Sequence, residues 1–174
     1  MVILKEMHSM IPSETINTAA EILNALHSVM DPEIPALSVV DLGIIGDVIV
    51  EDDFVKVKLI PTFIACPAIR QMQEMVKSKI LSMGFRDADV EIDRTVAWSS
   101  DRISKAGKKK LEEFGLGTPL KHGGTFNLEE IEHSQCPHCG SSNTSMNSLF
   151  GSSLCRSIHY CYDCRQGFER FKPV

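Results

Sequence analysis

Long apolar runs are missing from this sequence of 174 residues, because charged or polar residues interrupt every hydrophobic stretch. A membrane-spanning helix needs about 20 consecutive apolar residues, so none is expected. The N-terminal stretch MVILKEMHSM has only four apolar residues before Lys5, which is too short for a secretory signal. The cytosol is therefore the expected compartment. There, six cysteines are metal ligands or reactive thiols more often than disulfides.

Positive charge and aromatic residues are also scarce. The formal net charge is −5, aromatic residues make up 6% of the chain, and there is one tryptophan. Nucleic-acid binding uses a basic excess and aromatic stacking, so nucleic acid is not an expected partner. The sequence contains no G-x-G-x-x-G, P-loop or H-E-x-x-H motif. What remains is a chain that is 43% hydrophobic and can bury a core.

Hydrophobic periodicity predicts a compact α+β domain over residues 13–98. The predicted order is helix–strand–strand–helix–strand. The helices are expected at 13–30, with Ser13 as N-cap, and at 67–83, ended by Gly84. The strands are expected at 44–50, at 55–59 after a Glu51-Asp52-Asp53 turn, and around Val90, Ile92 and Val96.

The rest of the chain is predicted to form two further segments. Residues 99–134 are expected to hold an amphipathic helix at 99–114, with Ile103, Leu111 and Phe114 facing inward, and then a Gly-rich linker. Residues 135–174 are expected to form a separate ribbon module.

The ribbon segment has the cysteine spacing of a metal site. Cys136-x-x-Cys139 and Cys161-x-x-Cys164 are separated by 21 residues. Four thiolates form a closed tetrahedral site, which indicates a structural zinc ion, with iron or an iron–sulfur centre as the alternative. Cys155 is left over. It is either a buried residue of the ribbon core or an extra ligand near the metal.

Cys66 is the one cysteine in the first 135 residues. It precedes Pro67 and is predicted to be the N-cap of the second helix, where free N–H groups and the helix dipole would lower the pKa of its thiol. Thr62 lies four residues earlier, close enough to reach the same point. The alternative is a buried capping residue without chemistry.

Three acidic residues belong to the loop that follows the first helix. Asp31 and Glu33 lie in DPEIP, and Asp41 lies in DLG. Such carboxylates either are solvated loop charges or line a pocket. A neutral base near Cys66 is not evident, because His8 and His27 are the only histidines before His122. A Cys–His nucleophile is therefore poorly supported.

The segments MDPEIPALSVVDLGII and LIPTFIACPAI resemble the SufT-type iron–sulfur assembly family. The phrases AWSSDRIS, CPHCGSSNT, FGSSLCRSIHYCYDC and FKPV resemble the PaaD family of phenylacetate-degradation proteins, which join such a domain to a cysteine-rich ribbon. The resemblance extends from about residue 20 to the end. Ser99, Ser100 and Arg102 depart from the family's phrase after Trp98, so Trp98 is assigned no role.

The resemblance implies an α+β fold. It also implies an association with the phenylacetyl-CoA epoxidase, a di-iron oxygenase that receives electrons from an iron–sulfur reductase. The implied partners are the epoxidase subunits, this reductase and iron–sulfur assembly proteins. The implied cofactors are structural zinc in the ribbon and a transient cluster or iron at Cys66. The residues carried over for cluster handling are Asp31, Glu33, Asp41, Thr62 and Cys66.

Cys66 alone cannot hold a cluster, which generally needs about four thiolates. A second copy of the chain in a homodimer, the ribbon or a client protein would have to supply the remaining ligands, and Cys155 is a candidate donor. The expected function is thus accessory: maturation of the epoxidase, without catalytic residues of its own. The alternatives are a structural adaptor of the oxygenase and a thiol enzyme with Cys66 as nucleophile.

Overall fold

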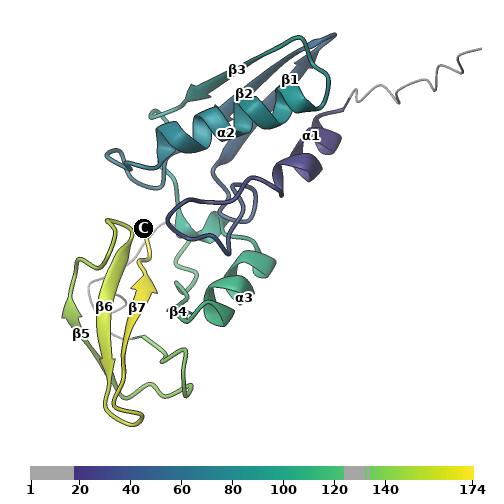
Figure 1. Ribbon diagram of the computed structural model, residues 1–174. Helices are drawn as coiled ribbons and strands as arrows, with labels where there is room; N and C mark the ends of the chain where they lie inside the picture. The colour runs from purple at the N-terminus through teal and green to yellow at the C-terminus, as the bar shows by residue number, and fades with distance from the viewer. Residues whose placement is uncertain (1–17, 124–131, 133) are drawn as a thin grey trace, which may run out of the picture.

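The computed structural model of the chain describes residues 18–123, 132 and 134–174 (Figure 1). The first part is an α+β domain with the predicted order of elements. It contains α1 (Ala19–Leu26), β1 (Ile45–Glu51), β2 (Phe54–Leu59), α2 (Ile69–Ser82) and β3 (Asp87–Ile92). Within the described residues, no helix combines the length and the hydrophobicity that a membrane crossing requires.

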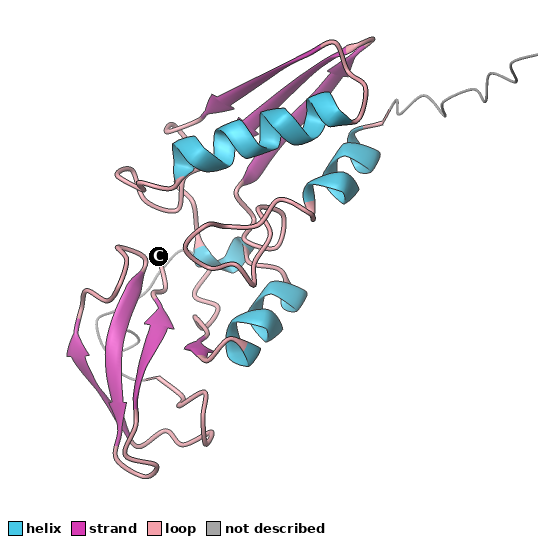
Figure 2. Ribbon diagram, in the orientation of Figure 1, coloured by secondary structure: helices cyan, strands magenta, loops and turns pink. Residues whose placement is uncertain are grey.

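The domain's sheet has the order β1–β2–β3, with an antiparallel β1–β2 pair and a parallel β2–β3 pair. The two helices pack against each other and against this sheet, and Figure 2 shows α2 lying across it. Alternation in β2 buries Val55, Val57 and Leu59, as the sequence predicts. The parallel crossover through α2 places the loop before α2, which carries Cys66, at the end of β2.

Helix α1 is shorter than the predicted 13–30. Thr18 is its N-cap and forms a capping box with Glu21, while the predicted N-cap Ser13 lies outside the described residues. The helix ends at Leu26 because the chain must become extended before Asp31-Pro32, where Met30 forms a β-bridge with Ser38. The prediction that Met30 belongs to the helix was therefore wrong.

The third strand also ends earlier than expected. β3 stops at Ile92, and the carboxylate of Asp93 then accepts hydrogen bonds from the N–H and hydroxyl of Thr95 at 2.8 and 2.6 Å. This turn takes Val96 out of the sheet, and 43% of Val96 is exposed. The prediction failed here because apolar residues recur at alternating positions in the sequence up to Val96, whereas the Asp93–Thr95 hydrogen bonds end the strand at Ile92.

The predicted helix over 99–114 is divided in two. A short 3-10 helix, η1 (Ser100–Arg102), is followed by extended backbone at Ile103 and then by α3 (Lys105–Glu113), which Ser104 caps. Ile103 and Leu111 are buried as predicted. Phe114 is not buried: it is the C-cap of α3 and 49% exposed.

The ribbon sheet has the order β4–β7–β6–β5. Its strands are β4 (Leu116–Gly117), β5 (Thr144–Ser148), β6 (Arg156–Cys161) and β7 (Gly167–Phe171). β5, β6 and β7 are antiparallel neighbours, whereas β4 comes from the segment before the ribbon and pairs with β7 in parallel. A strand from residues 99–134 thus extends the ribbon's sheet.

The ribbon and the domain share one hydrophobic core. Trp98 packs against Phe171 of β7 with ring centroids 5.8 Å apart, and its Nε1 donates a hydrogen bond to the carbonyl oxygen of Leu42 at 3.1 Å. The chain end is fixed in the same region, because the N–H of Ser100 donates to the carbonyl oxygen of Val174 at 2.8 Å. Figure 1 shows the C-terminus beside the loops of the α+β domain.

Candidate metal and thiol sites

The four predicted zinc ligands converge in the ribbon. The sulfur atoms of Cys136, Cys139, Cys161 and Cys164 all lie within 4.8 Å of one another. The separations between Cys136 and Cys164 and between Cys139 and Cys161 are 3.7 and 3.6 Å. A tetrahedral site with Zn–S bonds of about 2.3 Å places its sulfurs about 3.8 Å apart. The donor set and its spacing therefore fit zinc.

Two tight turns of similar design present these thiols. In the first, the N–H of Gly140 donates to the carbonyl oxygen of Cys136 at 2.9 Å, and Gly140 has a φ of 75°. In the second, the N–H of Cys161 donates to the carbonyl oxygen of Gln166 at 2.9 Å, and Arg165 has a φ of 59°. A left-handed residue directly after each Cys-x-x-Cys pair folds the chain back, so both thiols of the pair face one point.

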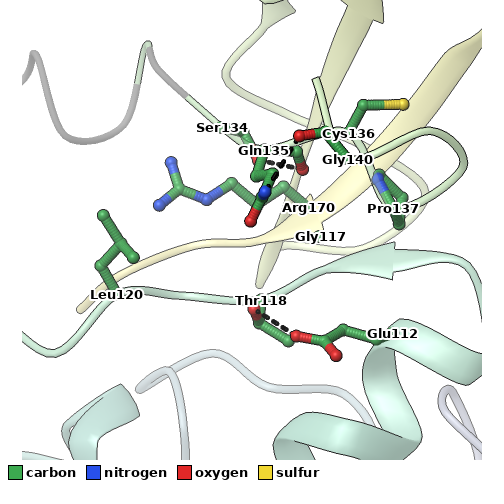
Figure 3. Close-up of a pocket in the computed structure, with 10 residues that line it drawn as sticks. All are labelled: Glu112, Gly117, Thr118, Leu120, Ser134, Gln135, Cys136, Pro137, Gly140 and Arg170. Atoms are coloured by element: carbon green, nitrogen blue, oxygen red, sulfur yellow. Dashed lines mark hydrogen bonds between the residues drawn. The ribbon is translucent and has the colours of Figure 1, made fainter. Parts of the chain in front are cut away.

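A cavity of about 330 Å³ lies beside the first cysteine pair (Figure 3). Glu112, Thr118, Leu120 and Arg170 contribute to its wall, together with Cys136. In Figure 3 the sulfur of Cys136 points away from Leu120 and Arg170. The sulfur of Cys136 is thus turned away from that side of the cavity wall. Four protein thiolates leave a bound zinc ion no free position, which is the arrangement of a structural site.

Cys66 lies in the loop before α2 and is not the N-cap of that helix. The N-cap is Ala68, and the N–H of Cys66 donates to the carbonyl oxygen of Phe63 at 3.0 Å in a preceding turn. The predicted N-cap position was therefore two residues early. The thiol nevertheless lies at the helix start, where the backbone N–H groups of Ala68 and Ile69 reach it.

The electrostatic setting of Cys66 is the opposite of the one expected. Burial raises the pKa of its thiol, and the negative charges of Glu33 and Asp31 raise it further. These effects outweigh the two N–H groups of the helix start, so the prediction of a lowered pKa was wrong. At neutral pH the thiol is protonated. It is not a pre-activated nucleophile.

Cys66 and Cys155 line one small recess where the domain meets the ribbon. Glu33, Thr62 and Pro67 complete its wall, with Phe63 and Leu154 beside them; we call this recess the seam pocket. Its cavity volume of about 10 Å³ is close to the minimum for one water molecule. The fold thus brings together three of the residues predicted for cluster handling and adds a thiol from the ribbon.

Asp31 supports the seam pocket without lining it. Its Oδ1 accepts hydrogen bonds from the N–H groups of Glu33 and Ile34 at 2.7 and 2.8 Å. Burial raises the pKa of this carboxyl, against the opposing effects of the two N–H groups and the nearby Arg156. Its observed contacts hold the DPEIP turn that orients Glu33.

Asp41 belongs to a different set of contacts. Its carboxylate accepts hydrogen bonds from the hydroxyls of Ser38 and Ser104 at 2.8 and 3.1 Å and pairs with the Lys110 ammonium at 2.6 Å. Burial alone would raise its pKa, but the bonds from Lys110 and Ser38 hold the pKa below its ordinary value. Asp41 is not part of the seam pocket wall and instead joins the DLG loop to α3.

Two cations near the seam pocket were missed by the sequence reasoning. The guanidinium of Arg156 donates to the carbonyl oxygen of Glu33 and pairs with Glu169 at 2.9 Å. The Lys172 ammonium lies 5.2 Å from the ring of Phe63 and 5.0 Å from that of Phe150. The sequence signal for Arg156 was its place directly after Cys155, the candidate donor of the ribbon.

Two family models match the chain on either side of this seam. The family described as an iron–sulfur cluster assembly protein matches residues 19–92, and the PaaD zinc beta ribbon domain matches residues 121–172. These ranges contain, respectively, Cys66 with its acidic loop and the four-cysteine cluster.

Similar proteins cover most of the chain or a part of it. The chain is 30% identical over 155 residues to an Escherichia coli K12 protein named as a "Putative 1,2-phenylacetyl-CoA epoxidase" subunit, and the match covers 88% of this chain and 92% of that one. A Porphyromonas gingivalis protein named "Fe-S protein maturation auxiliary factor" is 34% identical over 101 residues, covering 57% of this chain and 95% of its own. A solved structure, a conserved hypothetical protein of Thermotoga maritima, is 31% identical with a TM-score of 0.47, covering 57% and 95% of the two chains. The chain therefore belongs to the PaaD family of phenylacetyl-CoA epoxidase components and carries an iron–sulfur assembly domain followed by a zinc ribbon.

Proposed function

We propose that this protein is a cytoplasmic accessory factor that matures the phenylacetyl-CoA epoxidase by handling iron or an iron–sulfur centre at Cys66. Its family membership supports an assembly role. Its partners are then the epoxidase subunits or their iron–sulfur reductase, together with proteins that supply the metal. The zinc ion of the four-cysteine cluster is structural and takes no part in the transfer.

The observation that carries the proposal is the setting of Cys66 in the seam pocket. Cys66, Glu33 and Thr62 line one recess, and the negative charge of Glu33 acts on the Cys66 thiol. Sulfur and oxygen donors together suit iron, and a bound cation would favour the thiolate that the nearby carboxylates now disfavour. Cys66 thus has the character of a metal ligand.

The same setting argues against a thiol enzyme. Among the described residues, no histidine lines the seam pocket, and the pKa of the Cys66 thiol is raised. Small-molecule substrates generally occupy cavities of about 300–1,000 Å³, whereas this recess measures about 10 Å³. Among the described residues, the pocket therefore has no histidine base, and it has no space for a thioester.

A structural adaptor is the second candidate, and the shared core favours it. Because Trp98 and Phe171 pack across the seam, the domain and the ribbon can present one rigid surface to two partners. An adaptor requires an intact ribbon but does not require the Cys66 sulfur. Variants of Cys66 and of the ribbon cysteines therefore separate the two functions.

The test is the iron content and activity of the epoxidase purified from cells in which a variant is the only copy of this chain. Cys66→Ser is expected to lower both by about tenfold or more, since loss of a ligand costs at least as much as loss of a supporting group. Ala65→Ser is the matched control, because it places the same hydroxyl on the exposed neighbouring residue and should behave as wild type.

Normal epoxidase iron and activity with Cys66→Ser, at normal protein level, would refute the proposal. If in addition Cys136→Ser prevented assembly of the epoxidase complex, the adaptor role would replace it.

A further inference from the structure

The fold divides the six cysteines into two groups. Four form the closed cluster of the ribbon, and the other two, Cys66 and Cys155, line the seam pocket. The two thiols of the second group are 89 positions apart in the chain, one from the domain and one from the ribbon. The sulfur of Cys155 therefore does not belong to the zinc site, although it lies in the zinc module.

Two contacts within the ribbon and one hydrogen bond across the seam fix the position of Cys155. Its carbonyl oxygen accepts a hydrogen bond from the N–H of Lys172 at 2.9 Å, and its sulfur lies 3.0 Å from the hydroxyl of Ser153. The next residue, Arg156, bonds to the carbonyl oxygen of Glu33 on the other side of the seam. Cys155 is 8% exposed and belongs to the core that the two parts share. The juxtaposition is thus held by contacts on both sides of the seam.

Both thiols share the same electrostatic surroundings. Burial raises the pKa of Cys155, as it does for Cys66, and the carboxylates of Glu33 and Asp31 act in the same direction on both thiols. Two thiols that line one recess and feel the same negative charges can serve together as ligands of a cation. Arg156 and Lys172 lie on the ribbon side, where Arg156 lowers the pKa of Cys155 and Lys172 interacts with the same thiol.

We propose that Cys66 and Cys155 together form an open two-thiolate site for a single thiophilic divalent ion, ferrous iron in the maturation role. The inference rests on the proposed function and adds the second ligand, which comes from the ribbon. Each thiol loses one proton as it binds the ion, and no redox step is involved.

The size of the pocket and the number of its ligands define the site. A recess of about 10 Å³ has space for one ion but not for a cluster with its bridging sulfides. Within the described part of the chain, only the ribbon cluster brings ligand atoms of three or more residues within 4.8 Å of one another. Two thiolates fill only part of the coordination shell of a divalent ion, so a client ligand can occupy the remaining positions, whereas the closed ribbon site cannot exchange its ion in this way.

The test is anaerobic equilibrium binding of Fe(II) to the reduced full-length chain with zinc in its ribbon. The wild type is expected to bind about one iron in addition to one zinc. Cys155→Ser and Cys155→Val should each weaken Fe(II) binding by about tenfold or more, as should Cys66→Ser. Ser153→Ala is the matched control, because it alters a neighbour of the Cys155 sulfur without removing a thiolate. Zinc content reports whether each variant keeps its ribbon.

A second measurement needs no variant. X-ray absorption at the iron edge of the Fe(II)-loaded wild type should find two sulfur neighbours per iron. One sulfur neighbour, or Fe(II) binding that only Cys66→Ser weakens, would overturn the two-thiolate site and leave the proposed function standing. Fe(II) binding that none of these variants weakens would overturn the site, and the cellular test of Cys66→Ser would then decide the proposed function by itself.

Discussion

At the residue scale, the surroundings of each acidic side chain decide its role. Asp31 and Asp41 are both buried and lie in the same acidic loop region. Burial raises the pKa of Asp31, whereas hydrogen bonds from Lys110 and Ser38 lower that of Asp41 in spite of burial. The sequence grouped both residues with Cys66. The charge of Asp31 acts on the Cys66 thiol, whereas Asp41 is held by Lys110, a partner 69 residues further along the chain.

The Asp41–Lys110 pair predicts a specific loss of stability. Lys110→Met leaves a carboxylate that is 2% exposed without its cation, so the free energy of unfolding at pH 7 should fall by about 1–3 kcal/mol. This figure is below that for a fully buried pair, because the Lys110 side chain is 41% exposed and screened by water. Denaturant unfolding of wild type and Lys110→Met measures this loss. Lys109→Met, which removes an exposed pair with Glu113, is the control and should cost nothing measurable.

The same pair predicts a dependence on pH. The pKa of Asp41 in the folded protein lies below its ordinary value of 3.8, so ionised Asp41 stabilises the fold above about pH 4. That contribution is lost as the pH falls through the folded pKa. The stability difference between wild type and Lys110→Met should therefore shrink in acid. A difference that is constant from pH 7 to pH 3 would contradict the assignment.

At the scale of elements, hydrophobic periodicity predicted the order of the domain but not its boundaries. The buried stripe of α2 and the alternation of β2 can be recognised locally, because spacing alone determines which side chains face the core. The ends of α1 and β3 depended on the Met30–Ser38 bridge and the Asp93–Thr95 turn. β4 was not predicted, because two residues have no periodicity and only pairing with β7 defines them.

Trp98 received no role from the sequence, and the structure gives it a structural one. Trp98→Phe keeps most of the packing against Phe171 but removes the donor for the buried carbonyl oxygen of Leu42. The free energy of unfolding should fall by about 1–3 kcal/mol, the cost of an unsatisfied buried group. Denaturant unfolding of the zinc-loaded protein checks this value. An unchanged stability would mean that the hydrogen bond contributes nothing at the seam.

At the scale of the whole molecule, the two matched regions form one body around the seam. The metal cluster was predictable from four cysteines at a known spacing, since a short motif brings its own ligands together. The seam pocket was less accessible to sequence reasoning, which could name Cys155 as a candidate donor but could not place it beside Cys66. Its position depends on the packing of Trp98 against Phe171 and on the hydrogen bond from Arg156 to Glu33 of the DPEIP loop.

Removal of zinc tests this coupling between the parts. A metal-free ribbon of this size should lose its fold, because the metal supplies much of its folding free energy. Phe171 would then leave Trp98, the only tryptophan in the chain, so its emission should shift to longer wavelength on chelation and return when zinc is restored. The far-ultraviolet helical signal of the α+β domain should largely persist. An unshifted emission after complete zinc loss would show that the seam does not depend on the ribbon.

The central claim is that Cys66 handles iron or an iron–sulfur centre while the ribbon holds zinc. Metal and sulfide analysis of wild type and Cys66→Ser, purified side by side without oxygen, tests it most directly. We predict iron beyond the ribbon zinc in the wild type, and zinc alone in Cys66→Ser. Equal iron and sulfide in the two proteins would contradict this claim.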